Sequence, residues 1–224
     1  MPLFRNRSEA GRALAEQVKS AVPQPDILVL VLPRGGVPVG FEVAQALHAE
    51  MDVFLVRKLG VPGEEELALG ALASGGVRVL NHELIQYLRL SEETIQQVTA
   101  REERVLEARE LLYREGRPPV PIKGRTVVLV DDGLATGASM LAAARALRPS
   151  GAREVIIAVP VAPRESCDEL RREADQVICI ATPHPFGAVG LWYEDFAQVT
   201  DAEVCKLLEQ AARKSAEERA SDDA

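Results

Sequence analysis

An unbroken apolar run, followed by two acidic residues and a loop of small residues, limits what this chain can fold into. Residues 127–130 read Val-Val-Leu-Val, Asp131 and Asp132 come next, and an Ala-rich segment starts after residue 137. A strand that is apolar at every position is covered on both faces, as in a parallel sheet flanked by helices. The segment therefore predicts a buried strand, a loop beginning with two carboxylates, and a helix over about residues 138–147.

Short apolar runs alternate with helical segments along the rest of the chain. Strands are expected at 27–32, 52–56, 154–160 and 176–180, and helices at 8–20, 37–49 and 163–173, with Ser8 as the N-cap of the first helix. This alternation is typical of an α/β fold, a parallel sheet with helices on both faces, whose ligands bind beyond the carboxyl ends of the strands. We expect a single domain over residues 1–213 and a polar tail over 214–224.

A charged segment, residues 82–117, interrupts the alternation. Ser91 is a typical N-cap, and Gly116 marks the end of one long helix. Val98, Val105 and Leu112 recur on one face with Ile95 beside them, which predicts a narrow packed stripe. We expect a helical insertion whose charges form a solvated face, with partner binding as the alternative.

The loop after Asp132 has the chemistry of a phosphate site. Backbone N–H groups at the start of the following helix attract anions. Gly137 permits a positive φ, and Thr136 and Ser139 add hydroxyl donors. Asp131 and Asp132 are acceptors for vicinal hydroxyls or would face a metal ion. A plain strand-ending turn does not require the Thr-Gly-Ala-Ser that follows, and the Gly-Lys-Ser/Thr ending of a Walker loop is absent.

The string Val-Val-Leu-Val-Asp-Asp-Gly-Leu-Ala-Thr-Gly-Ala-Ser resembles the phosphoribosyl diphosphate (PRPP) motif of type I phosphoribosyltransferases. The resemblance implies that Asp131 and Asp132 bind the ribose hydroxyls, with Mg²⁺ held mainly by PRPP oxygens near them. It also implies that the 5′-phosphate is cradled by Ala135, Thr136, Gly137, Ala138 and Ser139. Family members that act on 6-oxopurines usually carry an aspartate where Ala135 stands, so hypoxanthine and guanine are disfavoured as acceptors.

A second loop, residues 33–36, reads Pro-Arg-Gly-Gly between the first apolar strand and a helix. Adjacent glycines allow close backbone approach to a ligand, and a guanidinium suits a diphosphate. In the family this place holds the pyrophosphate loop, so the resemblance assigns Arg34, Gly35 and Gly36 to the diphosphate. The next strand ends in Arg57-Lys58, and the resemblance places an Arg-Lys pair or a lysine there against the pyrophosphate, with Lys58 as the selected residue; two solvated charges at a strand end are the alternative.

Two further segments have open interpretations. Residues 60–76 are glycine-rich and resemble the mobile loop that closes over the reaction in this family, but a strand or packing turn fits equally. The chain is only 4% aromatic, yet residues 182–196 concentrate aromatics where the family places a hood, about residues 181–200, over the base. Stacking on a base and packing of a small subdomain are both open for Phe186, Val189, Trp192 and Tyr193.

Composition excludes some classes of protein. The formal net charge is −8 without a Lys/Arg run, which argues against a nucleic-acid binder. No apolar run approaches the ~20 residues of a membrane span. The first residues lack the apolar region of a signal peptide, so we expect a cytoplasmic protein. The three cysteines show no zinc spacing.

The leading hypothesis is a Mg²⁺-dependent phosphoribosyltransferase, in which a nucleobase attacks C1 of PRPP and pyrophosphate leaves. The catalytic group would comprise Asp131, Asp132, Arg34 and Lys58. The alternative is a regulatory protein that senses PRPP or a nucleotide on the same fold. A PRPP synthase-like kinase is disfavoured because no ATP-binding loop is visible. The sequence names neither the acceptor nor a general acid or base; many relatives form homodimers.

Overall fold

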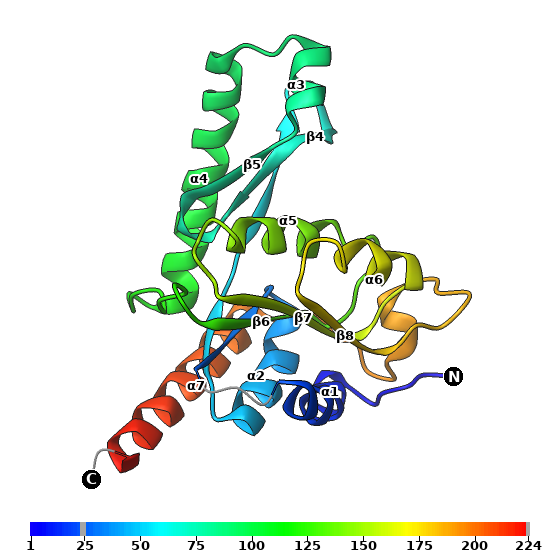
Figure 1. Ribbon diagram of the computed structural model, residues 1–224, viewed down its shortest axis with the longest axis vertical. Coiled ribbons are helices and arrows are strands. Elements are labelled where there is room, and N and C mark those ends of the chain that lie inside the picture. Colours follow the sequence, from blue (N-terminus) through cyan, green and yellow to red (C-terminus); the bar gives the residue numbers. More distant parts are fainter. Residues whose placement is uncertain (23–25, 223–224) are drawn as a thin grey trace.

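The computed structural model describes residues 1–22 and 26–222 of the chain (Figure 1). Its core is a five-stranded sheet in the order β2-β1-β6-β7-β8, in which every neighbouring pair is parallel. The strands are β1 (Ile27–Val31), β2 (Glu50–Val53), β6 (Thr126–Val130), β7 (Glu154–Val161) and β8 (Gln176–Ala181). The α/β fold predicted from the sequence is confirmed.

Helices cover both faces of this sheet because successive strand residues point to opposite sides. Val29 and Val31 belong to a core cluster with α1 (Arg7–Ala21), α2 (Gly36–Leu47) and α7 (Asp201–Asp222). Leu28 and Leu30 belong to a second cluster with α5 (Ala138–Leu147) and α6 (Arg164–Leu170). Figure 1 shows the two helical layers on either side of the sheet.

Helix α1 begins one residue earlier than the sequence indicated. Its N-cap is Asn6, whose Oδ1 accepts a hydrogen bond of 3.0 Å from the backbone N–H of Glu9. The expected cap, Ser8, is inside the helix. Both residue types are good N-caps, so local chemistry alone does not choose between them. The choice places Arg7 in the first turn of α1.

The chain between β2 and β6 forms an arm, which we define as residues 56–114. Its antiparallel sheet contains β3 (Val56–Val61), β4 (Glu64–Ala73) and β5 (Val77–Leu80), with the short helix η1 (Ser74–Gly76) before β5. Helices α3 (His82–Leu88) and α4 (Glu92–Arg114) complete it and project from the core with the sheet (Figure 1). The helices expected at 82–117 are thus half of a larger insertion, and residues 60–76 lie mostly in β4.

The packed stripe of helix α4 agrees with the predicted one at Ile95 and Val98 and departs from it further along the helix. Val105 and Leu112 are 37% and 49% exposed. A strict seven-residue repeat drifts around a helix of 3.6 residues per turn. The carboxylate residue Glu102 occupies one buried position, and a pattern of apolar residues does not predict such a position. The buried residues along this stripe are Ile95, Val98, Glu102, Leu106 and Tyr113.

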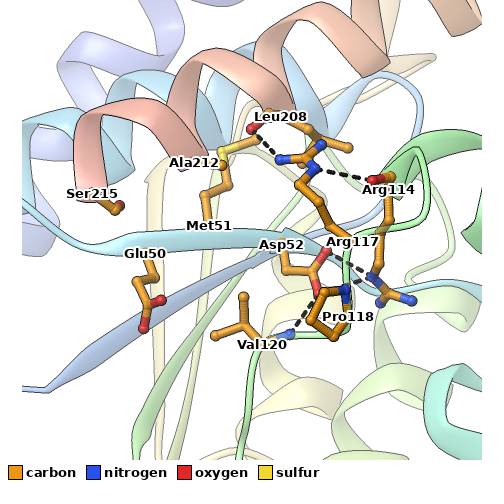
Figure 2. A pocket seen from close by; sticks show the side chains of 10 residues that line it. All are labelled: Glu50, Met51, Asp52, Arg114, Arg117, Pro118, Val120, Leu208, Ala212 and Ser215. Carbon is orange, nitrogen blue, oxygen red and sulfur yellow. Dashed lines mark hydrogen bonds and ion pairs between the residues drawn. The ribbon is translucent and has the colours of Figure 1, made fainter. Parts of the chain in front are cut away.

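A buried ion pair anchors the end of α4 to β2 (Figure 2). The Nε atom of Arg114 lies 3.0 Å from both carboxylate oxygens of Asp52. Their side chains are only 10% and 8% exposed. Asp52 also accepts a 3.1 Å hydrogen bond from the backbone N–H of Val120, and Arg117 donates to the carbonyl oxygen of Leu208 in α7 at 3.1 Å. The arm is therefore tied at its base to the core sheet and to α7.

The C-terminal part contains the hood and α7. After β8, residues 182–200 contain one short helix, η2 (Val189–Trp192), and α7 follows. Helix α7 continues through residues 214–222, so the expected boundary at 213 is not the end of an element; residues 223–224 lie outside the described residues. Every helix in the described part of the chain is too short or too polar to cross a membrane.

Candidate functional site

Two loops meet at the carboxyl ends of β1 and β6, which are neighbours in the sheet. Val31 pairs with Val130, so residues 33–36 and 131–139 leave the sheet side by side. A Cβ atom at Gly35 would lie 2.0 Å from Oδ2 of Asp132, and one at Gly36 would lie 2.9 Å from the carbonyl oxygen of Val130. The structure therefore joins the two loops that the sequence proposed as one site, and close approach explains both glycines.

Asp131 and Asp132 form an interacting acid pair at the end of β6. Burial and the charge of Asp132 raise the pKa of Asp131 well above its usual range. Burial also raises the pKa of Asp132, although a hydrogen bond from Arg7 opposes that rise. The backbone N–H of Asp132 donates to Oδ1 of Asp131 at 2.8 Å. Neighbouring carboxylates resist double ionisation, which favours a ligand with hydroxyl donors or a cation at this place.

Arg7, which the sequence analysis missed, holds Asp132. Its Nε donates to Oδ2 of Asp132 at 2.7 Å, and the two side chains are only 11% and 13% exposed. Its Nη1 donates to the carbonyl oxygen of Ala197 at 2.7 Å, and its guanidinium carbon lies 3.8 Å from the centre of the Phe196 ring. Since 125 positions separate Arg7 from Asp132, no local pattern reveals this contact.

The phosphate-loop candidate presents its backbone at the start of α5. Gly137 has a φ of 73°, the left-handed conformation that the sequence predicted. Gly137 is also the N-cap and offers no side chain, and the N–H of Ala138 makes a long, 3.5 Å hydrogen bond to Oγ1 of Thr136. The start of α5 therefore has the backbone donors of an anion site. The hydroxyl of Ser166 in α6 donates to the carbonyl oxygen of Ala135 at 3.1 Å, and this bond attaches the loop to α6. The exposed residues of this loop are Ala135, Thr136, Ala138 and Ser139.

The arm brings two guanidinium groups to the acid pair. Arg57 of β3 and Arg109 of α4 line a pocket of about 140 Å³ with Asp131, Ser139 and Pro33. Glu102 holds Arg57 at 2.6 Å. Arg109 is exposed and has no ion pair or hydrogen bond within residues 1–22 and 26–222. Arg109 carries no sequence signal for this role, because an arginine on a charged helix is not distinguishable from other solvated residues.

Lys58 is not among the residues that line this pocket; it lines a neighbouring cleft together with Ala138 and Ser139 of the phosphate-loop candidate. The chain leaves the core sheet after Val53, so Lys58 lies within β3 rather than at the end of a core strand. Its Nζ is 3.1 Å from a carboxylate oxygen of Glu66, and its side chain lines a wider cleft between the arm and α5. The structure thus brings Arg57, the neighbour of Lys58, to the acid pair.

The side chain of Arg34, in the second loop, lies near the start of α7. Its Nη1 is 3.8 Å from Oδ1 of Asp201, and its side chain is 36% exposed. The same oxygen of Asp201 accepts a 2.7 Å hydrogen bond from the hydroxyl of Tyr113. Burial and the bond to Asp201 raise the pKa of Tyr113 to about 12, which keeps it a donor. Asp201 is therefore shared between Tyr113 and a guanidinium that remains open to solvent.

The aromatic residues of the hood divide into two groups. Tyr193 is buried, and its hydroxyl donates to the carbonyl oxygen of Asp132, so it supports the acid pair instead of facing a ligand. Trp192 and Phe186 are partly exposed, with ring centres 6.2 Å apart and a 3.1 Å hydrogen bond from the indole nitrogen to the Phe186 carbonyl. Val189 contacts the first loop, since a Cβ atom at Gly133 would lie 2.5 Å from its Cγ1.

The model of one protein family, described as "Phosphoribosyl transferase domain", matches residues 4–195, which contain both loops, the arm and most of the hood. The chain belongs to this family. Two proteins of Mycobacterium tuberculosis, from strains CDC 1551 and H37Rv, are each named "Putative phosphoribosyl transferase" and are 44% identical to it over 222 residues. The alignment covers 99% of this phosphoribosyl transferase chain but 50% of each relative, so the chain spans about half the length of these curated relatives.

The phosphoribosyl transferase domain is also similar to a solved structure, TT1426 from Thermus thermophilus. The two chains are 45% identical and superpose with a TM-score of 0.84. The superposition covers 94% of this chain and 99% of TT1426. Because so little of either chain is left out, the arm belongs to the shared fold.

Proposed function

We propose that this phosphoribosyl transferase domain transfers the 5-phosphoribosyl group of PRPP to a nucleobase and releases pyrophosphate. The contact between Gly35 and Asp132 is the observation that carries the proposal. It combines a phosphate-binding helix start, a pair of hydroxyl acceptors and a loop with a guanidinium in one site. A phosphorylated sugar that also carries a diphosphate matches these three parts in order, and membership of the family supports the same substrate.

Each part of PRPP has a counterpart in the site. The N–H groups of residues 135–139 would receive the 5′-phosphate, and Asp131 and Asp132 the ribose hydroxyls. Arg34 and the Gly35-Gly36 backbone would hold the diphosphate, with Arg109 facing it from the arm. The transition state resembles a ribosyl cation, so the protein contributes mainly by positioning both partners and by stabilising the departing diphosphate. Lys58 would reach the diphosphate only by leaving Glu66.

The residues of the site fit Mg²⁺ that enters with the substrate. Within the described part of the chain, no three His, Cys, Asp or Glu side chains are arranged to hold a metal ion. Asp131 and Asp132 would be the nearest protein oxygens to such an ion, and Mg²⁺ usually keeps waters and substrate phosphates among its ligands. When bound, Mg²⁺ would neutralise charge on the diphosphate.

The acceptor would lie between the acid pair and the hood. Phe186, Val189 and Trp192 are the candidates for contact with its flat face, because Tyr193 is committed to Asp132. The loop has no carboxylate at Ala135, so we propose that the acceptor is not a 6-oxopurine. The homodimer and the cytoplasmic location stay predictions.

A panel of nucleobases with PRPP and Mg²⁺, assayed for pyrophosphate release, tests the proposal. We expect turnover with at least one base and none after the double substitution Asp131→Asn/Asp132→Asn. Calorimetry with PRPP alone separates the alternatives. Tight binding without turnover on any base would favour a PRPP-sensing protein, and the absence of PRPP binding would reject both functions.

A further inference from the structure

The segment of residues 3–7 connects the hood to the acid pair. The backbone N–H groups of Leu3 and Phe4 donate to the carbonyl oxygen of Trp192 at 2.9 and 3.1 Å. In return, the carbonyl oxygen of Phe4 accepts a 2.9 Å hydrogen bond from the N–H of Glu194. The segment is thus paired with the hood immediately before α1 begins, and Arg7 comes directly after this pairing.

The guanidinium of Arg7 is constrained from three directions. One nitrogen binds Asp132, another binds the carbonyl of Ala197, and the flat face lies on Phe196. Phe196 in turn packs against Tyr193, with ring centres 5.1 Å apart. Because a guanidinium is planar and rigid, these contacts fix the direction in which Nε points. Arg7 therefore links the carboxylate of Asp132 to residues 193–197 of the hood.

Asp132 is held on its other sides as well. Tyr193 donates to its backbone carbonyl, and its carboxylate lies against Gly35, where a Cβ atom would overlap it. Arg7 binds Oδ2, which leaves Oδ1 as the oxygen for a ligand. Without Arg7 the carboxylate would lose the hydrogen bond to Oδ2, and its interaction with the side chain of Asp131 would be left to oppose rotation about the Cβ–Cγ bond.

We propose that Arg7 is a positioning residue, which orients the Asp132 carboxylate toward the ribose hydroxyls of the substrate and couples that orientation to the hood. The inference rests on the proposed function and adds a residue to it from outside both loops. The inference predicts which ligands depend on Arg7. Ligands with a ribose should depend on Arg7, whereas a diphosphate without a ribose should not.

Calorimetry with three ligands tests this prediction. PRPP, ribose 5-phosphate and inorganic pyrophosphate would be titrated into the wild type, Arg7→Ala, Arg7→Lys and the control Arg5→Ala. Arg5 is a matched control because its side chain is 72% exposed and, among the described residues, pairs with Glu9 in the first turn of α1. Alanine at this position keeps the backbone carbonyl of residue 5, which accepts from the N–H of Asp195 in the hood. For Arg7→Ala we expect about tenfold or greater loss of affinity for PRPP and ribose 5-phosphate, and unchanged affinity for pyrophosphate.

The remaining variants decide between positioning and general damage. Arg7→Lys keeps the cation but loses the planar fork, so we expect an intermediate loss, and Arg5→Ala should match the wild type. In an Asp132→Asn background, Arg7→Ala should cost little more, because the orientation it controls is already lost. Equal weakening of all three ligands, or unchanged ribose 5-phosphate affinity, would overturn the inference. If the wild type binds no PRPP, the proposed function itself fails.

Discussion

Glu102 of α4 binds the guanidinium of Arg57 at 2.6 Å, and Arg57 lines the same pocket as Asp131. Glu102 is 5% exposed and lies on the packed stripe of its helix. The pair joins α4 to β3 and fixes the side of the arm that faces the site. Because Arg57 also lines the pocket, the geometry of the pocket depends on the contact between α4 and β3.

We expect Glu102→Gln to weaken both the arm and PRPP binding. Burial raises the pKa of Glu102, but hydrogen bonds and charge from Arg57 and Arg101 outweigh it, so the pKa is lowered overall. A lowered carboxyl pKa contributes stability that is present above its unfolded value and is lost as the pH falls through the folded value. Urea denaturation of both proteins between pH 3 and 7 should therefore show a difference that shrinks at the acid end. A constant difference across that range would contradict the assignment.

Gly35→Ala should abolish PRPP binding without unfolding the protein. The added Cβ would lie 2.0 Å from Oδ2 of Asp132, so the acid pair or the loop must move. We expect at least a tenfold loss of PRPP affinity, measured by calorimetry. Gly116→Ala is the control: its φ of 79° makes alanine costly by about 1 kcal/mol, but its Cβ would meet open space. That variant should lose stability and keep its PRPP affinity; similar PRPP losses in both would count against the contact.

Arg109→Ala should selectively weaken binding of the diphosphate. Arg109 lines the pocket beside Asp131, whereas Arg104 is exposed on the same helix and lines no pocket there. Charge-assisted hydrogen bonds contribute about 1.5–3 kcal/mol, so we expect a loss of about tenfold or more in affinity for pyrophosphate and PRPP. Ribose 5-phosphate affinity should not change. Arg104→Ala should behave as the wild type in all three titrations, and an equal effect of the two substitutions would indicate only a general charge effect.

Asp52→Ala should destabilise the whole domain. It leaves Arg114 buried with one carboxylate partner fewer, and removing one member of a buried pair costs about 3–5 kcal/mol. Asp168→Ala breaks a pair with Arg171 whose side chains are 56% and 53% exposed, so its cost should be below about 1 kcal/mol. Urea denaturation curves of the two variants test the contrast. Similar midpoints would mean that the arm is anchored by other contacts.

Substitutions at two neighbouring hood residues should raise KM for different substrates. Trp192→Leu should raise KM for the acceptor base with little change in KM for PRPP, because Trp192 is partly exposed and its indole N–H is bonded within the hood, to the carbonyl oxygen of Phe186. Tyr193→Phe removes the donor to the Asp132 carbonyl and should raise KM for PRPP several-fold. Steady-state kinetics with each substrate varied in turn separates these effects. A Trp192 variant that changes only PRPP kinetics would place the acceptor elsewhere.

Much of the core and both loops were accessible from local patterns. The run at 127–130, the two carboxylates after it and the glycine at 137 each act within a few residues, so the strand, the helix start and the left-handed turn followed directly. The arm sheet was harder to recognise. Residues 64–73 pair only with other arm strands, and their mixed burial lacks the continuous apolar run of a core strand.

The amino-acid sequence by itself determined the parallel α/β core, the acid pair and the two candidate anion-binding loops, because periodicity and backbone chemistry specify these locally. Only the tertiary structure decided which cations lie beside the candidate site. Arg7 comes from the start of the chain, and Arg57 and Arg109 come from an arm whose orientation depends on buried pairs such as Arg114 with Asp52. The residues that flank a charged side chain in the sequence do not indicate its partner. The partner is determined by contacts that form when distant elements pack together.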